Sequence, residues 1–147
     1  MKKNLIRIGI AVLLLVSSLF VYNQFFRQGN EGAKEVQIII TVVQEGDDVV
    51  VLDVTKRTDD EMLGTFLETV LADEDLTYNF SGNVSDPFGR YIVGIGEYET
   101  KDTTVGPWWL FNSSTNADCV SAGYCPGIDI TPLYDKDIFM FEFTSSY

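Results

Sequence analysis

The sequence predicts an α+β domain in which one antiparallel or mixed sheet packs on a single helix, with a transmembrane helix before it. Three observations predict this architecture. An uncharged run covers residues 8–26, one segment over residues 58–75 has apolar residues at helical spacing, and the segments around it alternate like half-buried strands. At 147 residues and 46% hydrophobic content, the chain has room for one folded domain and an appendage.

The N-terminal segment, residues 1–27, is typical of a signal anchor. Its uncharged run would span roughly 28 Å as a helix, close to a hydrocarbon core of about 30 Å. Residues 1–33 carry a net charge of +3 out of a total of −12, which leaves −15 for residues 34–147. We therefore expect a single-pass cell-membrane protein with its N-terminus in the cytoplasm and its C-terminal domain outside. The alternative is a signal peptide cleaved near residues 16–18, which would give a secreted protein.

The elements of the domain follow a linker over residues 28–35. We expect residues 36–147 to be the extracellular domain, and its first two segments, 36–43 and 49–55, are β-branched and read as a hairpin. The helix follows over 58–75, with Thr58 and Glu61 as a capping box and fraying from about Ala72. Further strands are expected over 76–80, 90–99, 107–112 and 137–143, with a tight turn at 134–137.

The charge and the missing residue types exclude several function classes. An acidic domain repels phosphate backbones, so nucleic acid is not an expected partner. The chain has no histidine, and its many carboxylates lie in turns and at the start of the predicted helix, where they are normally solvated or capping. None of the acidic runs matches a calcium loop. We expect no enzymatic activity and no cofactor or metal.

The two cysteines, Cys119 and Cys125, lie six positions apart with Gly123 between them. In an oxidising compartment such a pair predicts a disulfide. A two-thiolate metal half-site is the rival, but without histidine or further cysteines a tetrahedral zinc site is disfavoured.

The aromatic stretch "GPWWLFN", residues 106–112, is the strongest candidate for a binding surface. Adjacent tryptophans on a strand point to opposite faces, so one is expected in the core and the other either outward, as a stacking platform, or under the cysteine loop. The predicted ligand-binding residues are Trp108, Trp109, Phe111, Asn112, Tyr91 and Tyr124.

Three stretches, "YNFSGNVSDPFGRYIVGIGEYE", "WWLFN" and "ITPLYDKDIFMFEF", resemble the transcobalamin C-terminal-like domain, a family of Gram-positive bacterial surface proteins. The similarity covers about residues 36–143. The chain departs at Ser113 and Lys136, where the family usually has glycine. The positions that match are Phe88, Gly89, Tyr91, Ile92, Ile95, Trp108, Trp109, Asn112 and Asp137.

The resemblance implies a β-grasp-like fold and a binding role. In the vitamin carriers that give the family its name, this domain covers one side of a bound corrinoid and is paired with a helical domain, which we do not expect in this chain. We therefore expect a membrane-tethered extracellular binding module for a small molecule or a surface protein. The alternatives are an accessory domain for corrinoid uptake and a purely structural or adhesive domain.

Overall fold

The computed structural model describes residues 32–44 and 47–145. The predicted membrane segment, 1–27, and the first part of the linker lie outside the described residues. Neither helix in the described part of the chain has the length and apolar character that a bilayer span requires. In chain order the elements are β1 (Lys34–Gln44), β2 (Asp47–Thr58), α2 (Leu63–Asp73), β3 (Tyr78–Ser81), β4 (Tyr91–Ile95), β5 (Tyr98–Glu99), β6 (Trp108–Asn112), α3 (Ala117–Ala122) and β7 (Ile138–Thr144).

The strands form two sheets, which confirms the mixed α+β class and shows that the prediction of one sheet is wrong. The four-stranded sheet has the order β2-β1-β7-β6, with β1 and β7 parallel and the other pairs antiparallel. The three-stranded sheet has the order β3-β4-β5 and is antiparallel. The stretch 90–99 is not one strand, because Gly96 adopts a left-handed backbone (φ +62°) and turns β4 back on itself as β5.

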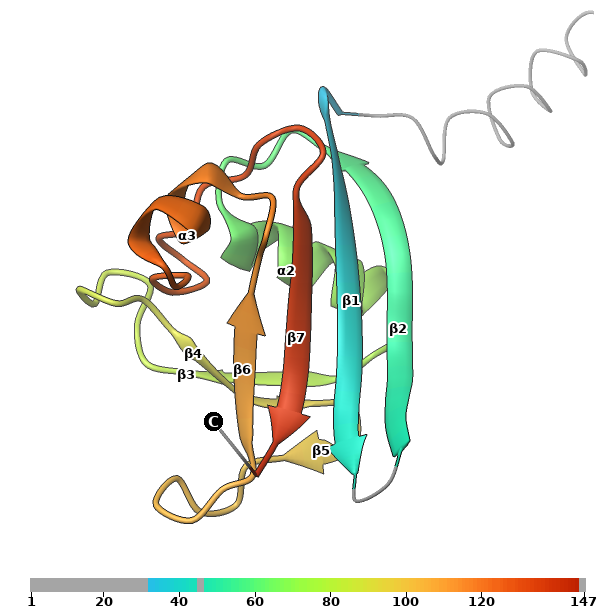
Figure 1. Cartoon of the computed structure of the whole chain (residues 1–147), viewed down its shortest axis with the longest axis vertical. Coiled ribbons are helices and arrows are strands. Elements are labelled where there is room, and N and C mark those ends of the chain that lie inside the picture. Colours follow the sequence, from blue (N-terminus) through green and yellow to red (C-terminus); the bar gives the residue numbers. More distant parts are fainter. Residues whose placement is uncertain (1–31, 45–46, 146–147) are drawn as a thin grey trace, which may run out of the picture. The chain divides into compact units, whose positions relative to one another are not determined.

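The core lies on one face of the four-stranded sheet, where α2 and the smaller sheet cover it (Figure 1). Alternate residues of β1 and β7 point into it, and the parallel register pairs Ile38 with Phe139 and Ile40 with Phe141. Helix α2 contributes its apolar side, as its spacing predicts: Leu63, Phe66, Leu67, Val70 and Leu71 are buried.

Helix α2 begins at Leu63, so the predicted capping box at Thr58 is wrong. Thr58 is the last residue of β2, paired with Lys34, and its hydroxyl exchanges hydrogen bonds with Asp60. The first N–H groups of the helix donate instead to backbone carbonyls, Leu63 N to Thr131 O (3.0 Å) and Gly64 N to Ile128 O (2.7 Å). Backbone carbonyls of a distant loop therefore accept the hydrogen bonds that a local capping residue was expected to accept.

A second, short helix, α3, lies in the cysteine loop, so the prediction of a single helix is also wrong. Asn116 caps it by accepting a hydrogen bond from Cys119 N, and Gly123 ends it in a left-handed conformation (φ +78°). The predicted disulfide between Cys119 and Cys125 is present and closes this helix onto the following turn.

The two positions where the chain departs from the family pattern behave differently. Lys136 adopts φ +71° in the turn before β7, the conformation that favours glycine. Ser113 is buried and serves as a side-chain acceptor for Asn116 N (2.9 Å). The matched residue Asp137 is also buried, and its carboxylate accepts hydrogen bonds from Asn116 Nδ2 (2.6 Å) and Tyr134 N (2.9 Å).

Candidate functional site

Trp109 is the tryptophan that fills the core. It pairs with Phe143 across β6 and β7, its ring centroid lies 5.0 Å from that of Phe143, and its side of the strand faces the smaller sheet. The indole N–H donates to the backbone oxygen of Tyr98 (3.1 Å), and the residue is only 8% exposed. Trp109 therefore joins the edge of one sheet to the edge of the other.

Trp108 is half-buried, and the loop that packs on it precedes β6 rather than being the cysteine loop. Its indole N–H donates to Thr103 O (2.9 Å). Gly106 adopts φ +77°, and a Cβ added there would lie 2.6 Å from Trp108 Cε3. The ring thus rests on the backbone of Gly106, where only glycine leaves room for it.

The loop over residues 100–107 is held by its own hydrogen bonds. The carboxylate of Asp102 accepts from Thr104 N (2.8 Å) and Thr104 Oγ1 (2.6 Å), and its backbone oxygen accepts from Gly106 N (2.9 Å). The hydrogen bonds from Thr104, that of its hydroxyl first and that of its backbone N–H next, lower the pKa of Asp102. The platform under Trp108 is therefore built into the loop rather than formed on binding.

A cavity of about 150 Å³ opens beside Trp108, where β4, β6 and the 100–107 loop meet. We call it the Trp108 cavity. Three of the predicted binding residues line it, Tyr91, Trp108 and Trp109. The remaining lining residues, which the sequence pattern did not single out, are Ile92, Val93, Thr100, Thr103 and Leu110.

The other three predicted binding residues do not line this cavity. Phe111 is half-buried and stacks on Phe141, with ring centroids 5.4 Å apart. Asn112 is exposed at the end of β6, and Tyr124 is exposed beyond α3. Only the first residues of β6, from Trp108 to Leu110, line the cavity with β4 and the 100–107 loop. Phe111 and Asn112 lie further along the same strand and therefore fall outside it.

A salt-bridge cluster anchors the start of β4 and so places Tyr91. The Arg90 guanidinium contacts Asp129 (Nη2 to Oδ1, 2.8 Å) and Glu68 of α2 (Nη1 to Oε1, 2.7 Å). Asp129 also accepts from Arg90 N (2.7 Å), and its side chain is 4% exposed. Hydrogen bonding from the Arg90 side chain lowers the pKa of Asp129, despite the opposing effect of burial.

Gly89 explains one part of the matched "FG" pattern. Its backbone is left-handed (φ +68°), and an added Cβ would lie 2.7 Å from Asp129 Cβ. Glycine therefore lets the chain pass close enough to Asp129 for Arg90 to reach it.

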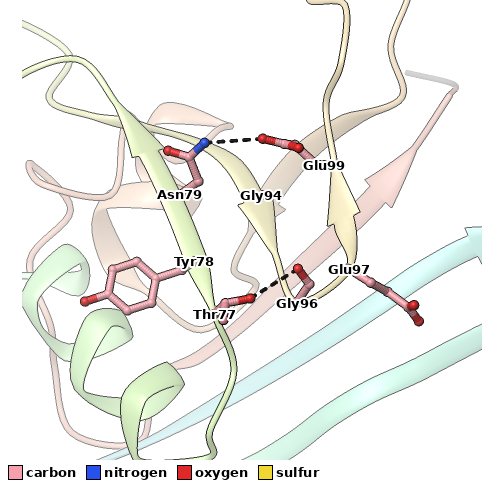
Figure 2. Close-up of a pocket in the computed structure, with 7 residues that line it drawn as sticks. All are labelled: Thr77, Tyr78, Asn79, Gly94, Gly96, Glu97 and Glu99. Atoms are coloured by element: carbon pink, nitrogen blue, oxygen red, sulfur yellow. Dashed lines mark hydrogen bonds between the residues drawn. The ribbon is translucent and has the colours of Figure 1, made fainter.

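A second, polar groove of about 240 Å³ lies on the three-stranded sheet (Figure 2). Asn79, Gly94 and Glu99 are neighbours across β3, β4 and β5. Because Gly94 has no side chain, Asn79 Nδ2 reaches over it to Glu99 Oε1 (3.4 Å), while the Tyr78 ring points away on the other side of β3. The groove thus presents amide and carboxylate groups, and Tyr78 is the aromatic residue among those that line it.

Comparison with known proteins supports the fold and does not identify a functional site. No protein-family model matches the chain, and no curated protein matches it. Among solved structures, it is similar to the crystal structure of a candidate metal-binding protein from Ruminococcus gnavus, with a TM-score of 0.51 and 19% sequence identity. The match covers 78% of this chain and 99% of that one, and at this identity it shows the fold alone. Within residues 32–44 and 47–145, no three His, Cys, Asp or Glu residues gather as a metal site would require.

Proposed function

We propose that this chain is a membrane-tethered extracytoplasmic binding module whose ligand site is the Trp108 cavity. The observation that carries the proposal is the meeting of Tyr91 with Trp108 and Trp109 around one open space. An engineered protein cavity of about 150 Å³ binds benzene, so this space suits a single ring. Aromatic faces supply large contact area, and the preformed loop lowers the entropic cost of binding.

The wider setting of the module is part of the same proposal. The uncharged run over residues 8–26 supports the membrane tether, and the Cys119–Cys125 disulfide suits an oxidising compartment outside the cytoplasm. A β-grasp-like fold is supported by the parallel pairing of β1 with β7 beside the β1–β2 hairpin, with α2 on one face. The partner is then a small molecule or the side chain of a surface protein.

Corrinoid capture is a narrower form of this proposal. Pockets that enclose drug-sized ligands measure about 300–1,000 Å³, and the Trp108 cavity is smaller than that range. A corrinoid would therefore touch it with one edge, and a second protein would have to cover the rest.

The test is ligand titration of the full chain in phosphatidylcholine vesicles, read by tryptophan fluorescence against protein-free vesicles. Both tryptophans of the chain border the cavity, so the signal reports on the site itself. Toluene, p-cresol and cobinamide serve as probes. We expect a saturable change with the single-ring probes.

Two variants and one control make the titration specific. Val93→Phe fills the cavity and Trp108→Ala removes one wall, so both should abolish saturable binding. Tyr124→Ala changes an exposed aromatic outside the cavity and should bind like the unmodified protein. No saturable change with any probe, or equal binding by all three variants, would refute the site and favour a structural or adhesive role.

A further inference from the structure

The side chain of Thr100 carries a polar atom whose environment is incomplete. Thr100 is 8% exposed, and its Oγ1 has no hydrogen-bond partner within the described part of the chain. Buried hydroxyl groups in native proteins are almost always paired, since an unpaired one loses its hydration without compensation. Thr100 also lines the Trp108 cavity, so a ligand bound there would lie beside this residue.

The position of Thr100 is set by the backbone and not by its own hydroxyl. Thr100 N donates to Val93 O (2.8 Å), which extends the β4–β5 pairing by one step beyond β5. This bond holds the residue against β4 whether or not the side chain finds a partner. The hydroxyl is therefore not needed to place the strand end.

The two indole N–H groups beside the cavity are already used. The indole N–H of Trp108 donates to Thr103 O, and that of Trp109 donates to Tyr98 O. Most of the remaining wall is apolar, with Ile92, Val93 and Leu110 beside the aromatic rings. The cavity thus combines a ring-sized apolar space with one buried hydroxyl.

This combination discriminates between classes of ring. A sugar ring carries several hydroxyl groups, and most of them would lose water without gaining a partner here. A purely hydrocarbon ring would leave the Thr100 hydroxyl unpaired. A water molecule held in the cavity needs about two to four polar partners, whereas Thr100 supplies only one buried partner. Water is therefore a weaker partner for this hydroxyl than a ring that carries its own hydroxyl.

We infer that the Trp108 cavity takes a phenol: an apolar ring with one hydroxyl, which pairs with Thr100 Oγ1. The inference rests on the proposed function, because it names the ligand class of the same site. The phenol is either a free small molecule or the side chain of a tyrosine in a partner protein. The shared chemistry is one ring and one hydroxyl.

The deciding variant is Thr100→Val, which removes the hydroxyl and keeps the shape. It is tested with p-cresol and toluene, using the full chain in vesicles and the same fluorescence readout. We expect the affinity for p-cresol to fall roughly threefold to tenfold, the range for one net hydrogen bond, while the affinity for toluene stays equal or rises. Thr65→Val, at an exposed residue of α2 outside the cavity, is the matched control and should leave both affinities unchanged.

Thermal unfolding gives a readout that needs no ligand. Because Thr100 Oγ1 is unpaired, Thr100→Val should leave the melting temperature unchanged or raise it. A lowered melting temperature would mean that the hydroxyl already has a partner and would overturn the inference. A fall in toluene affinity equal to that for p-cresol would also overturn it, since Thr100 would then not interact with the hydroxyl of the ligand.

The outcomes separate this inference from the proposed function. If neither ring binds the unmodified protein, the site itself fails and the inference falls with it. If toluene binds and Thr100→Val does not reduce p-cresol affinity, the inference alone fails. Comparison of p-cresol with N-acetyltyrosinamide distinguishes the sources: tighter binding of the amide indicates a tyrosine of a partner protein, and tighter binding of p-cresol indicates a free phenol.

Discussion

Replacing Arg90 by methionine should destabilise the domain and disturb the wall of the Trp108 cavity. The substitution keeps a long apolar side chain but removes the guanidinium from Asp129, whose side chain is 4% exposed, and from Glu68, which is 30% exposed. Glu68 can regain water, whereas Asp129 is left as an uncompensated buried charge. Removing one partner of a buried ion pair typically costs about 3–5 kcal/mol.

The structure places the expected loss at the lower end of that range. Asp129 keeps one hydrogen bond after the substitution, because its other donor is the backbone N–H of residue 90. We therefore expect a loss of about 3 kcal/mol in the free energy of unfolding at pH 7. With a urea m-value of about 1–3 kcal/mol per molar, the midpoint should fall by roughly 1–3 M.

The direction in which a second substitution changes the free energy of unfolding tests whether the unpaired charge of Asp129 causes this loss. In the unmodified protein, Asp129→Asn removes a charge-assisted pair and should destabilise. In the Arg90→Met background the same change removes the unpaired charge and should stabilise by about 1 kcal/mol or more. Urea unfolding of all four proteins, followed by tryptophan fluorescence, gives this cycle.

The pH dependence supplies an independent check. The pKa of Asp129 is lowered in the folded protein, so its contribution is present above its unfolded pKa of about 3.9 and is lost as the pH falls through the folded value. The deficit of Arg90→Met should therefore be larger at pH 7 than at pH 3. A loss below about 1 kcal/mol, or equal destabilisation by Asp129→Asn in both backgrounds, would refute the buried-charge account.

Three further predictions concern other parts of the domain. Gly106→Ala places a Cβ against Trp108 at a residue with a left-handed backbone. The free energy of unfolding should therefore fall by at least about 1–2 kcal/mol, and the tryptophan emission should change. Reducing the Cys119–Cys125 disulfide should lower the free energy of unfolding by about 2 kcal/mol. Urea unfolding with and without reductant measures this difference. Asn116→Asp would place a second carboxylate against Asp137 Oδ2, so stability should drop by several kcal/mol at pH 7 and recover in acid; pH-independent loss would contradict this reason.

Local patterns in the sequence were sufficient for much of the fold. The β-branched alternation of residues 36–43 and 49–55 predicts the first hairpin, and the spacing from Leu63 to Leu71 predicts the buried face of α2. Both depend on contacts with near neighbours or on one periodicity. The cysteine spacing likewise predicts the disulfide, since Gly123 lets so short a loop bend back.

Long-range contacts decided what those patterns could not. The start of α2 depends on carbonyls of Ile128 and Thr131, more than 60 positions away along the chain, so a local capping rule fails there. The division into two sheets likewise depends on which distant strand each segment pairs with. Strand β6 pairs with β7 and not with β5, which directly precedes it in the chain.

The amino-acid sequence alone settled that the chain is acidic and lacks histidine, and that aromatic residues cluster around residues 106–112. Only the tertiary structure could select Tyr91, Trp108 and Trp109 from the six aromatic and polar candidates, and add Thr100 to them. The physical reason is that a cavity is a property of packing between segments. Its walls come from β4, β6 and the loop between β5 and β6, and no single segment records how the others meet it.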